Sequence, residues 1–78
     1  MSPVKLTQRA RARAIAIVVE ARFSVRDFEA LRRENPEYWD SPRNDMARGI
    51  YGEAMREKER LTHVPDAQLV AEFAAVRR

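Results

Sequence analysis

Alanine is the commonest apolar residue of this chain, and this sets the first limit on its fold. Twelve of the apolar residues are alanine, so the large side chains that can fill a core are few. Alanine is also the strongest helix former. A chain this short buries only about 60% of the surface that its unfolded form exposes. We therefore expect one small helical domain spanning 1–78, with a thin core that a partner or a second copy can supplement.

Residues 7–22 contain neither Gly nor Pro and predict a long first helix. Leu6, Ala10 and Ala14 recur at helical spacing, and both Ala and Arg favour helices. The alternation of arginine and alanine over 9–14, followed by β-branched residues, suits a strand instead. We favour the helix, because this stretch is long for a strand in a small domain.

The rest of the chain has the pattern of short helices separated by prolines. Ser24 is placed to cap a helix that ends near Glu34. Ser41 and Pro42 open the next helix, and a last amphipathic helix follows Pro65. The predicted fold class is all-α, a small bundle of about three or four short helices that are individually marginal.

With a strand at its N-terminus, the chain resembles a ribbon-helix-helix repressor. The strand would project Arg9, Arg11 and Arg13 from one face, and residues 23–35 and 41–61 would form the two helices. This resemblance implies a dimer that places the strand in the major groove of DNA. It is the alternative fold.

The charges are distributed unevenly along the chain. Residues 1–26 hold six basic groups and one acidic group, a net charge of +5, whereas residues 27–78 hold nine basic and eleven acidic groups, a net charge of −2. The basic N-terminal segment 1–26 creates a positive field that can attract phosphates or an acidic protein surface. The predicted partner-binding residues in it are Lys5, Arg9, Arg11 and Arg13.

Two further pairs of residues are candidates for contacts. Tyr38 and Trp39 could form a binding hot spot, because Trp and Tyr dominate interface energetics. The alternative is that Trp39 closes the core between the second and third helices, with Tyr38 facing outward. Gly49 and Gly52 lie inside a predicted helix, where each costs about 0.5–1 kcal/mol relative to Ala. Close packing of another helix, within the fold or across a dimer, would explain these glycines.

Catalysis is not expected. The chain has no cysteine, and its single histidine, His63, lies in a predicted turn, which excludes Cys–His nucleophiles and most zinc sites. With two glycines in all, there is no Gly-rich phosphate loop. We expect no metal, no cofactor and no small-molecule substrate. The longest apolar run, 14–19, is far short of the roughly 18–20 residues that span a membrane, so we expect a cytoplasmic protein without membrane contact.

These features favour a non-enzymatic regulator or inhibitor that binds a macromolecular partner, most of all a protein complex. The chain is similar in size and composition to accessory proteins of phages and mobile elements, which block host nucleic-acid-handling or defence complexes. One alternative is a dimeric DNA-binding transcriptional regulator that uses the basic N-terminal segment. Another is a structural or assembly subunit, and a homodimer is compatible with each of these functions.

Overall fold

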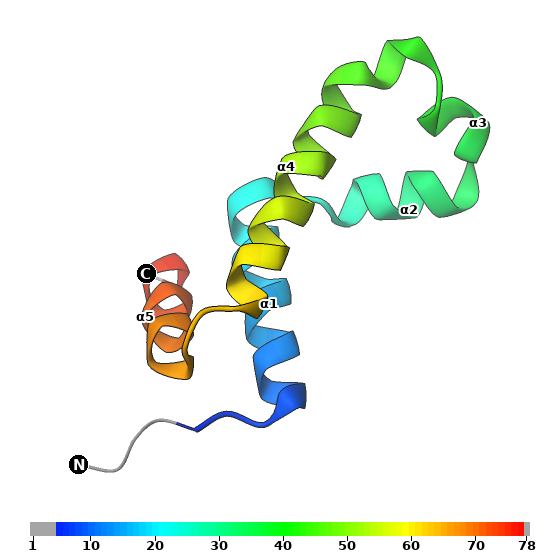
Figure 1. Ribbon diagram of the computed structural model, residues 1–78. Coiled ribbons are helices and arrows are strands. Elements are labelled where there is room, and N and C mark those ends of the chain that lie inside the picture. Colours follow the sequence, from blue (N-terminus) through cyan, green and yellow to red (C-terminus); the bar gives the residue numbers. More distant parts are fainter. Residues whose placement is uncertain (1–4, 78) are drawn as a thin grey trace.

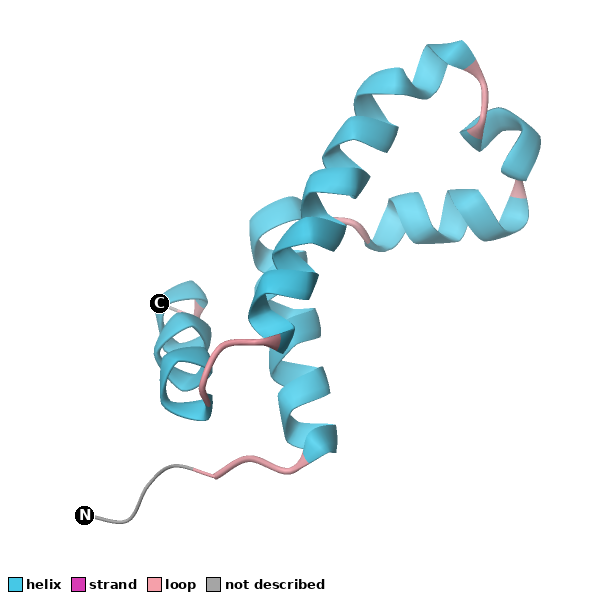
Figure 2. Cartoon of the chain, in the orientation of Figure 1, coloured by secondary structure: helices cyan, strands magenta, loops and turns pink. Residues whose placement is uncertain are grey.

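The structure is a computed structural model that describes residues 5–77, and within this range the regular elements are all helices (Figure 1; Figure 2). They are α1 (Gln8–Phe23), α2 (Arg26–Glu34), α3 (Pro36–Trp39), the 3₁₀ turn η1 (Pro42–Asn44), α4 (Asp45–Thr62) and α5 (Asp66–Val76). The predicted all-α fold is confirmed. The strand alternative is wrong for the described residues, and with it the ribbon-helix-helix architecture.

The β-branched residues of α1 explain why this segment forms a helix. Ile15, Val18 and Val19 are all buried, and together they form the helical face that packs on the core. Thr7 caps this helix, and its hydroxyl accepts the N–H of Ala10 at 3.0 Å. Tertiary burial therefore outweighs the modest strand preference of these side chains.

Ser24 does not cap α2, so that prediction was wrong. It ends α1 instead, with a left-handed backbone (φ 52°) and its N–H bonded to the carbonyl of Glu20 at 2.8 Å. Only two residues separate α1 from α2, so the chain changes direction within a very short turn (Figure 1). The Glu20 carboxylate then accepts the N–H of Arg26 at 3.0 Å and satisfies a free donor in the first turn of α2.

The main core lies where α1 packs against α4 and α5. It consists of Ile15, Val18, Val19, Val25, Ala54, Leu61 and Leu69. Leu61 and Leu69 are fully buried, and they lie on either side of the turn that joins α4 to α5. A core of this composition is thin, as the alanine content predicted.

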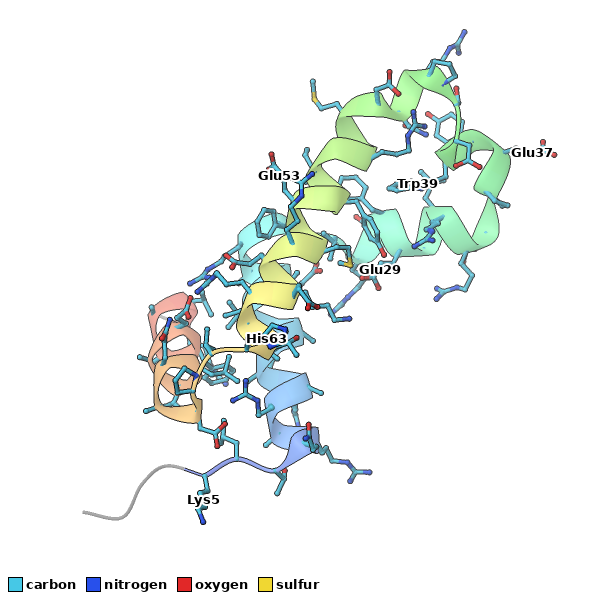
Figure 3. All side chains as sticks on the ribbon, in the orientation of Figure 1. Lys5, Glu29, Glu37, Trp39, Glu53 and His63 are labelled. Carbon is cyan, nitrogen blue, oxygen red and sulfur yellow. The ribbon has the colours of Figure 1, made fainter. Side chains whose placement is uncertain are left out.

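Trp39 forms a second, aromatic cluster at the other end of the molecule (Figure 3). It is 6% exposed and lies between Phe28 of α2 and Tyr51 of α4, with ring centroids 6.1 Å and 5.4 Å away. Arg48 holds the adjacent turn, because its Nη1 donates to the carbonyl oxygens of Trp39 and Ser41, each at 2.7 Å. The prediction that Trp39 closes the packing between these helices is confirmed.

The molecule is elongated, with principal extents of 52 × 21 × 20 Å. Its radius of gyration is 14.8 Å, whereas a compact domain of this length has about 11.5 Å. The chain exposes 6108 Å² to solvent, against about 4900 Å² for a compact monomer of this mass. Among the described residues, no helix has the length and apolar character needed to cross a membrane.

Candidate interaction surface

Arg11 points into the fold. Its guanidinium forms an ion pair with Asp66, the first residue of α5. Its Nη2 donates to three carbonyl oxygens at the end of α4 and in the following turn, those of Val64 at 2.8 Å, Leu61 at 3.1 Å and Thr62 at 3.3 Å. These carbonyls have no partner within α4, because the last turn of a helix leaves its acceptors free. Arg11 thus ties α1 to both other helices of the core.

Asp66 accepts two hydrogen bonds in the same cluster. The N–H of Leu6 donates to its Oδ2 at 2.8 Å, and Arg11 binds its Oδ1. The Leu6 N–H, followed by the Arg11 guanidinium, holds the pKa of Asp66 below its usual value. The charges of Arg11 and Asp66 therefore neutralise each other within the fold. While these contacts are intact, the Arg11 guanidinium is not available to a partner.

Arg9 and Arg13 are exposed one helical turn apart on α1. Among the described residues, neither side chain has a carboxylate within ion-pair distance. Arg11 lies about 160° from both around the helix axis, given 3.6 residues per turn. Lys5, which precedes α1, is also exposed (Figure 3). The structure therefore keeps Arg9 and Arg13 together and removes Arg11 from the predicted basic group.

An apolar groove runs between α1 and α5, and we call it the α1/α5 groove. Its volume is about 460 Å³. It is lined by Leu6, Ala10, Arg13, Ala14, Ile17, Val70, Phe73 and Arg77. Val70 is 40% exposed, which is unusual for a large aliphatic side chain in a chain with so few of them. Among the described residues, the charged groups that line this groove are two arginines, Arg13 and Arg77.

A second groove of about 600 Å³ lies along the opposite side of α1, facing α2 and α4. It has an apolar floor that includes Val19 and Met55. Its rim carries both signs of charge, with Glu20 and Glu29 beside Arg26 and Lys58. With Arg11, the charged groups that line it are three basic and two acidic, so it favours a partner of one sign less than the α1/α5 groove does. The second groove is larger, but its charges indicate no single partner chemistry.

A network of ion pairs joins α1, α4 and α5 away from the α1/α5 groove. Arg22 contacts Glu57 and Glu72, each at 3.1 Å, and Arg60 contacts the same two carboxylates, with 2.6 Å to Glu72. The Arg60 hydrogen bond is the main cause that lowers the pKa of Glu72 to about 2, and these pairs raise the pKa of Arg60 in turn. Here the charges compensate one another within the fold.

The other predicted contact residues are far from the basic pair. Trp39 is buried, whereas Tyr38 is 47% exposed, as the alternative prediction required. A Cβ built on Gly49 or Gly52 would meet nothing within 4 Å, so the predicted close approach of another helix of this chain is wrong for the described residues. Residues 45–62 form α4 without such a neighbour at these positions. A dimer contact through the two glycines stays a prediction.

The one histidine of the chain, His63, lies on the surface. His63 is 72% exposed in its side chain, and its Nε2 lies 3.0 Å from a Glu59 carboxylate oxygen on the surface (Figure 3). Within residues 5–77, no three His, Cys, Asp or Glu side chains converge as metal ligands.

The sequence did not single out Ile17, Val70, Phe73 or Arg77 as a surface. The signal was present as two stripes at helical spacing, Ala10, Ala14 and Ile17 on α1, and Val70, Phe73 and Arg77 on α5. Such stripes usually mark a core, and here the core is formed by the neighbouring face of each helix.

No protein-family model, curated protein or solved structure matches this chain.

Proposed function

We propose that this chain is a small, non-enzymatic regulator or inhibitor that acts by binding a protein partner. The observation that supports this proposal is the shape of the molecule. The chain exposes about 1200 Å² more than a compact monomer of its mass. A standard protein–protein interface buries about 800 Å² on each partner, so one such contact would cover much of this excess.

The position of the apolar side chains also supports binding. Tyr38, Met46 and Val70 are large hydrophobic residues with 47%, 80% and 40% of their surface exposed. They lie on α3, α4 and α5, so the exposed apolar surface is spread along the whole length of the molecule. Singly exposed apolar residues are common on protein surfaces, so the strongest support comes from Val70, which lies with Ile17 and Phe73 in one apolar groove.

A nucleic-acid-binding regulator is the second candidate, and one observation favours it. Arg9 and Arg13 are exposed and unpaired within the described residues, so both can contact phosphates. Two arginines beside an apolar surface bind phosphates weakly, and Phe73, the aromatic residue that lines the groove with Arg13, already has the guanidinium of Arg77 5.2 Å from its ring centre, which leaves less room for a stacked base. The protein partner is therefore the stronger proposal.

Site-specific photo-crosslinking tests the proposal. A photoreactive p-benzoylphenylalanine is placed in turn at Tyr38, at Met46 and at Ala74, an exposed α5 residue one turn after Val70. The chain is produced and irradiated in the cells that naturally make it, and the adducts are separated before and after nuclease treatment. We expect a discrete protein adduct from at least one position. Adducts that nuclease removes, or none from any position, would contradict the proposal.

A further inference from the structure

The α1/α5 groove has the form of a receptor for a helix. Its floor is aliphatic and aromatic, with Ala10, Ala14 and Ile17 from α1 opposite Val70 and Phe73 from α5. The stretch from Ala10 to Ile17 rises about 10 Å, or two helical turns. The small alanine side chains of α1 allow another helix to approach its backbone closely. An amphipathic helix binds such a groove through apolar anchors spaced at i, i+3 or i+4, and i+7.

Among the described residues, the charged groups at the rim of the groove are all positive. Arg13 and Arg77 line it, and the guanidinium of Arg77 lies 5.2 Å from the ring centre of Phe73. Arg9 lies one turn before Arg13 on the exposed side of α1. Both carboxylates of α5 are engaged elsewhere: Asp66 is bonded inward to Arg11 and to the N–H of Leu6, and Glu72 is paired with Arg22 and Arg60. Within residues 5–77, no carboxylate lines the groove.

We propose that the α1/α5 groove binds an amphipathic helix of a partner protein whose apolar stripe is flanked by Asp and Glu. This assignment rests on the proposed function and names the chemistry of its partner. The apolar stripe would cover Val70 and Ile17, and the acidic flanks would pair with Arg9, Arg13 and Arg77. Charge complementarity of this kind fixes the orientation of a helix and raises its association rate.

The same charges exclude other occupants of the groove. A second copy that used this face would bring its own Arg9 and Arg13 against those of the first, which is repulsive in a symmetric dimer. A nucleic acid would place hydrated phosphates on a floor of apolar side chains, including Ile17, Val70 and Phe73, which offer no hydrogen-bond donors. An acidic amphipathic helix satisfies both the floor and the rim.

Selection from a displayed peptide library tests this assignment. Random peptides of about 16 residues, long enough for four helical turns, are selected on the full chain. The enriched peptides are synthesised, and their Kd values are measured by fluorescence anisotropy. We expect an apolar i, i+4, i+7 pattern flanked by Asp and Glu, and we expect Val70→Glu to weaken binding by at least about tenfold. Three results would overturn the assignment. The enriched peptides could be basic, their Kd could be unchanged by Val70→Glu, or the selection could enrich no peptide.

A charge exchange makes the test specific to the arginines. The double variant Arg9→Glu and Arg13→Glu should bind the acidic peptide about tenfold or more weakly than the wild type does. It should bind more tightly than the wild type to a version of this peptide that has Lys in place of each acidic residue. Met46→Glu is the matched control, because Met46 is also exposed and apolar but lies on α4, outside the groove. It should change the Kd by less than about twofold. If Met46→Glu weakens peptide binding as much as Val70→Glu does, the α1/α5 groove is not the binding site.

The outcomes separate the groove from the proposed function. If crosslinking at Tyr38 or Met46 yields protein adducts but no selected peptide depends on Val70, the chain binds a protein through a face other than the groove. The proposed function would then stand, and the assignment of the groove would not. Absence of any protein adduct would remove the proposed function itself. Binding of the chain to duplex DNA or to anionic vesicles that Val70→Glu abolishes would also overturn the assignment to a helix.

Discussion

The side chain of Arg11 spans from α1 to Asp66 at the start of α5, and on the way it binds the carbonyl oxygens that end α4. One guanidinium therefore fixes three helices relative to one another. Its neighbours Arg9 and Arg13 are exposed to solvent two residues away on either side. Residues that look equivalent in the sequence thus have opposite roles in the structure.

Arg11→Ala should destabilise the fold. The substitution leaves the Val64 and Leu61 carbonyls without their charged donor and Asp66 without its ion pair. We expect the Tm to fall by about 5–10 °C, since hydrogen bonds to charged groups are the strong ones. Circular dichroism melting measures this change.

Arg9→Ala is the matched control for this change. It removes the same side chain from the same helix, but Arg9 has no bond within the described structure. Its Tm should stay within about 2 °C of the wild type. Equal losses in the two variants would show that the general charge of α1, and not the contacts of Arg11, stabilises the fold.

Ser24→Gly should stabilise the protein. Ser24 has a left-handed backbone, which costs an L-residue about 1 kcal/mol and costs glycine almost nothing. We expect the free energy of unfolding in urea to rise by about 0.5–1 kcal/mol. A decrease would mean that the Ser24 hydroxyl caps α2 after all, as its position in the sequence first indicated.

Replacing the two α4 glycines should also stabilise the chain. Neither Gly49 nor Gly52 has a positive φ, and an added methyl group meets open space at both positions. Gly49→Ala and Gly52→Ala should each raise the free energy of unfolding by about 0.5–1 kcal/mol, because Ala is the better helix former. The oligomeric state is measured in parallel by sedimentation. If stability rises but a dimer or partner contact is lost, the glycines serve an interface.

The ion-pair network predicts how stability depends on pH. The pKa of Glu72 is about 2 in the folded chain because of Arg60 and Arg22, below its usual value of 4.5. A lowered pKa stabilises the fold above the unfolded value, and this contribution is lost as the pH falls from about 4.5 to 2. We expect the Tm to decrease across this window.

Glu72→Gln removes this contribution at every pH. Its Tm should therefore decline less than that of the wild type between about pH 5 and pH 2. Glu53→Gln is the control, since Glu53 is exposed on α4 and has no ion pair in the described structure (Figure 3). Parallel declines of wild type and Glu72→Gln would contradict the role assigned to Glu72.

Much of the fold could be predicted from local sequence signals. Pro42 begins the 3₁₀ turn that leads into α4, Pro65 lies directly before α5, and the stretch 7–22, which lacks Gly and Pro, identifies α1. The short helix α3, which begins at Pro36, was not predicted. Ser24 was misread because a serine ahead of a helix fits both the end of one helix and the start of the next. Only the two-residue spacing between α1 and α2 decides between them.

The candidate surface was harder to predict, because it depends on which helices pack together. Arg11 became structural only when α5 placed Asp66 beside it, 55 residues away in the sequence. Val70 and Phe73 read as core residues of an amphipathic helix. Phe73 is half-buried against the core and Val70 is exposed, because the thin, elongated packing leaves one side of the α1–α5 contact uncovered.

One crosslinking comparison addresses the proposed surface directly. The photoreactive residue at Ala74 is combined either with Arg9→Ala and Arg13→Ala, or with Arg26→Ala and Arg33→Ala, which remove the same charge from exposed α2 positions. We expect the yield of the protein adduct to fall at least about fivefold in the first variant and to stay near the wild-type level in the second. Equal yields in both variants, or an equal loss in both, would contradict a partner held at the α1/α5 groove by Arg9 and Arg13.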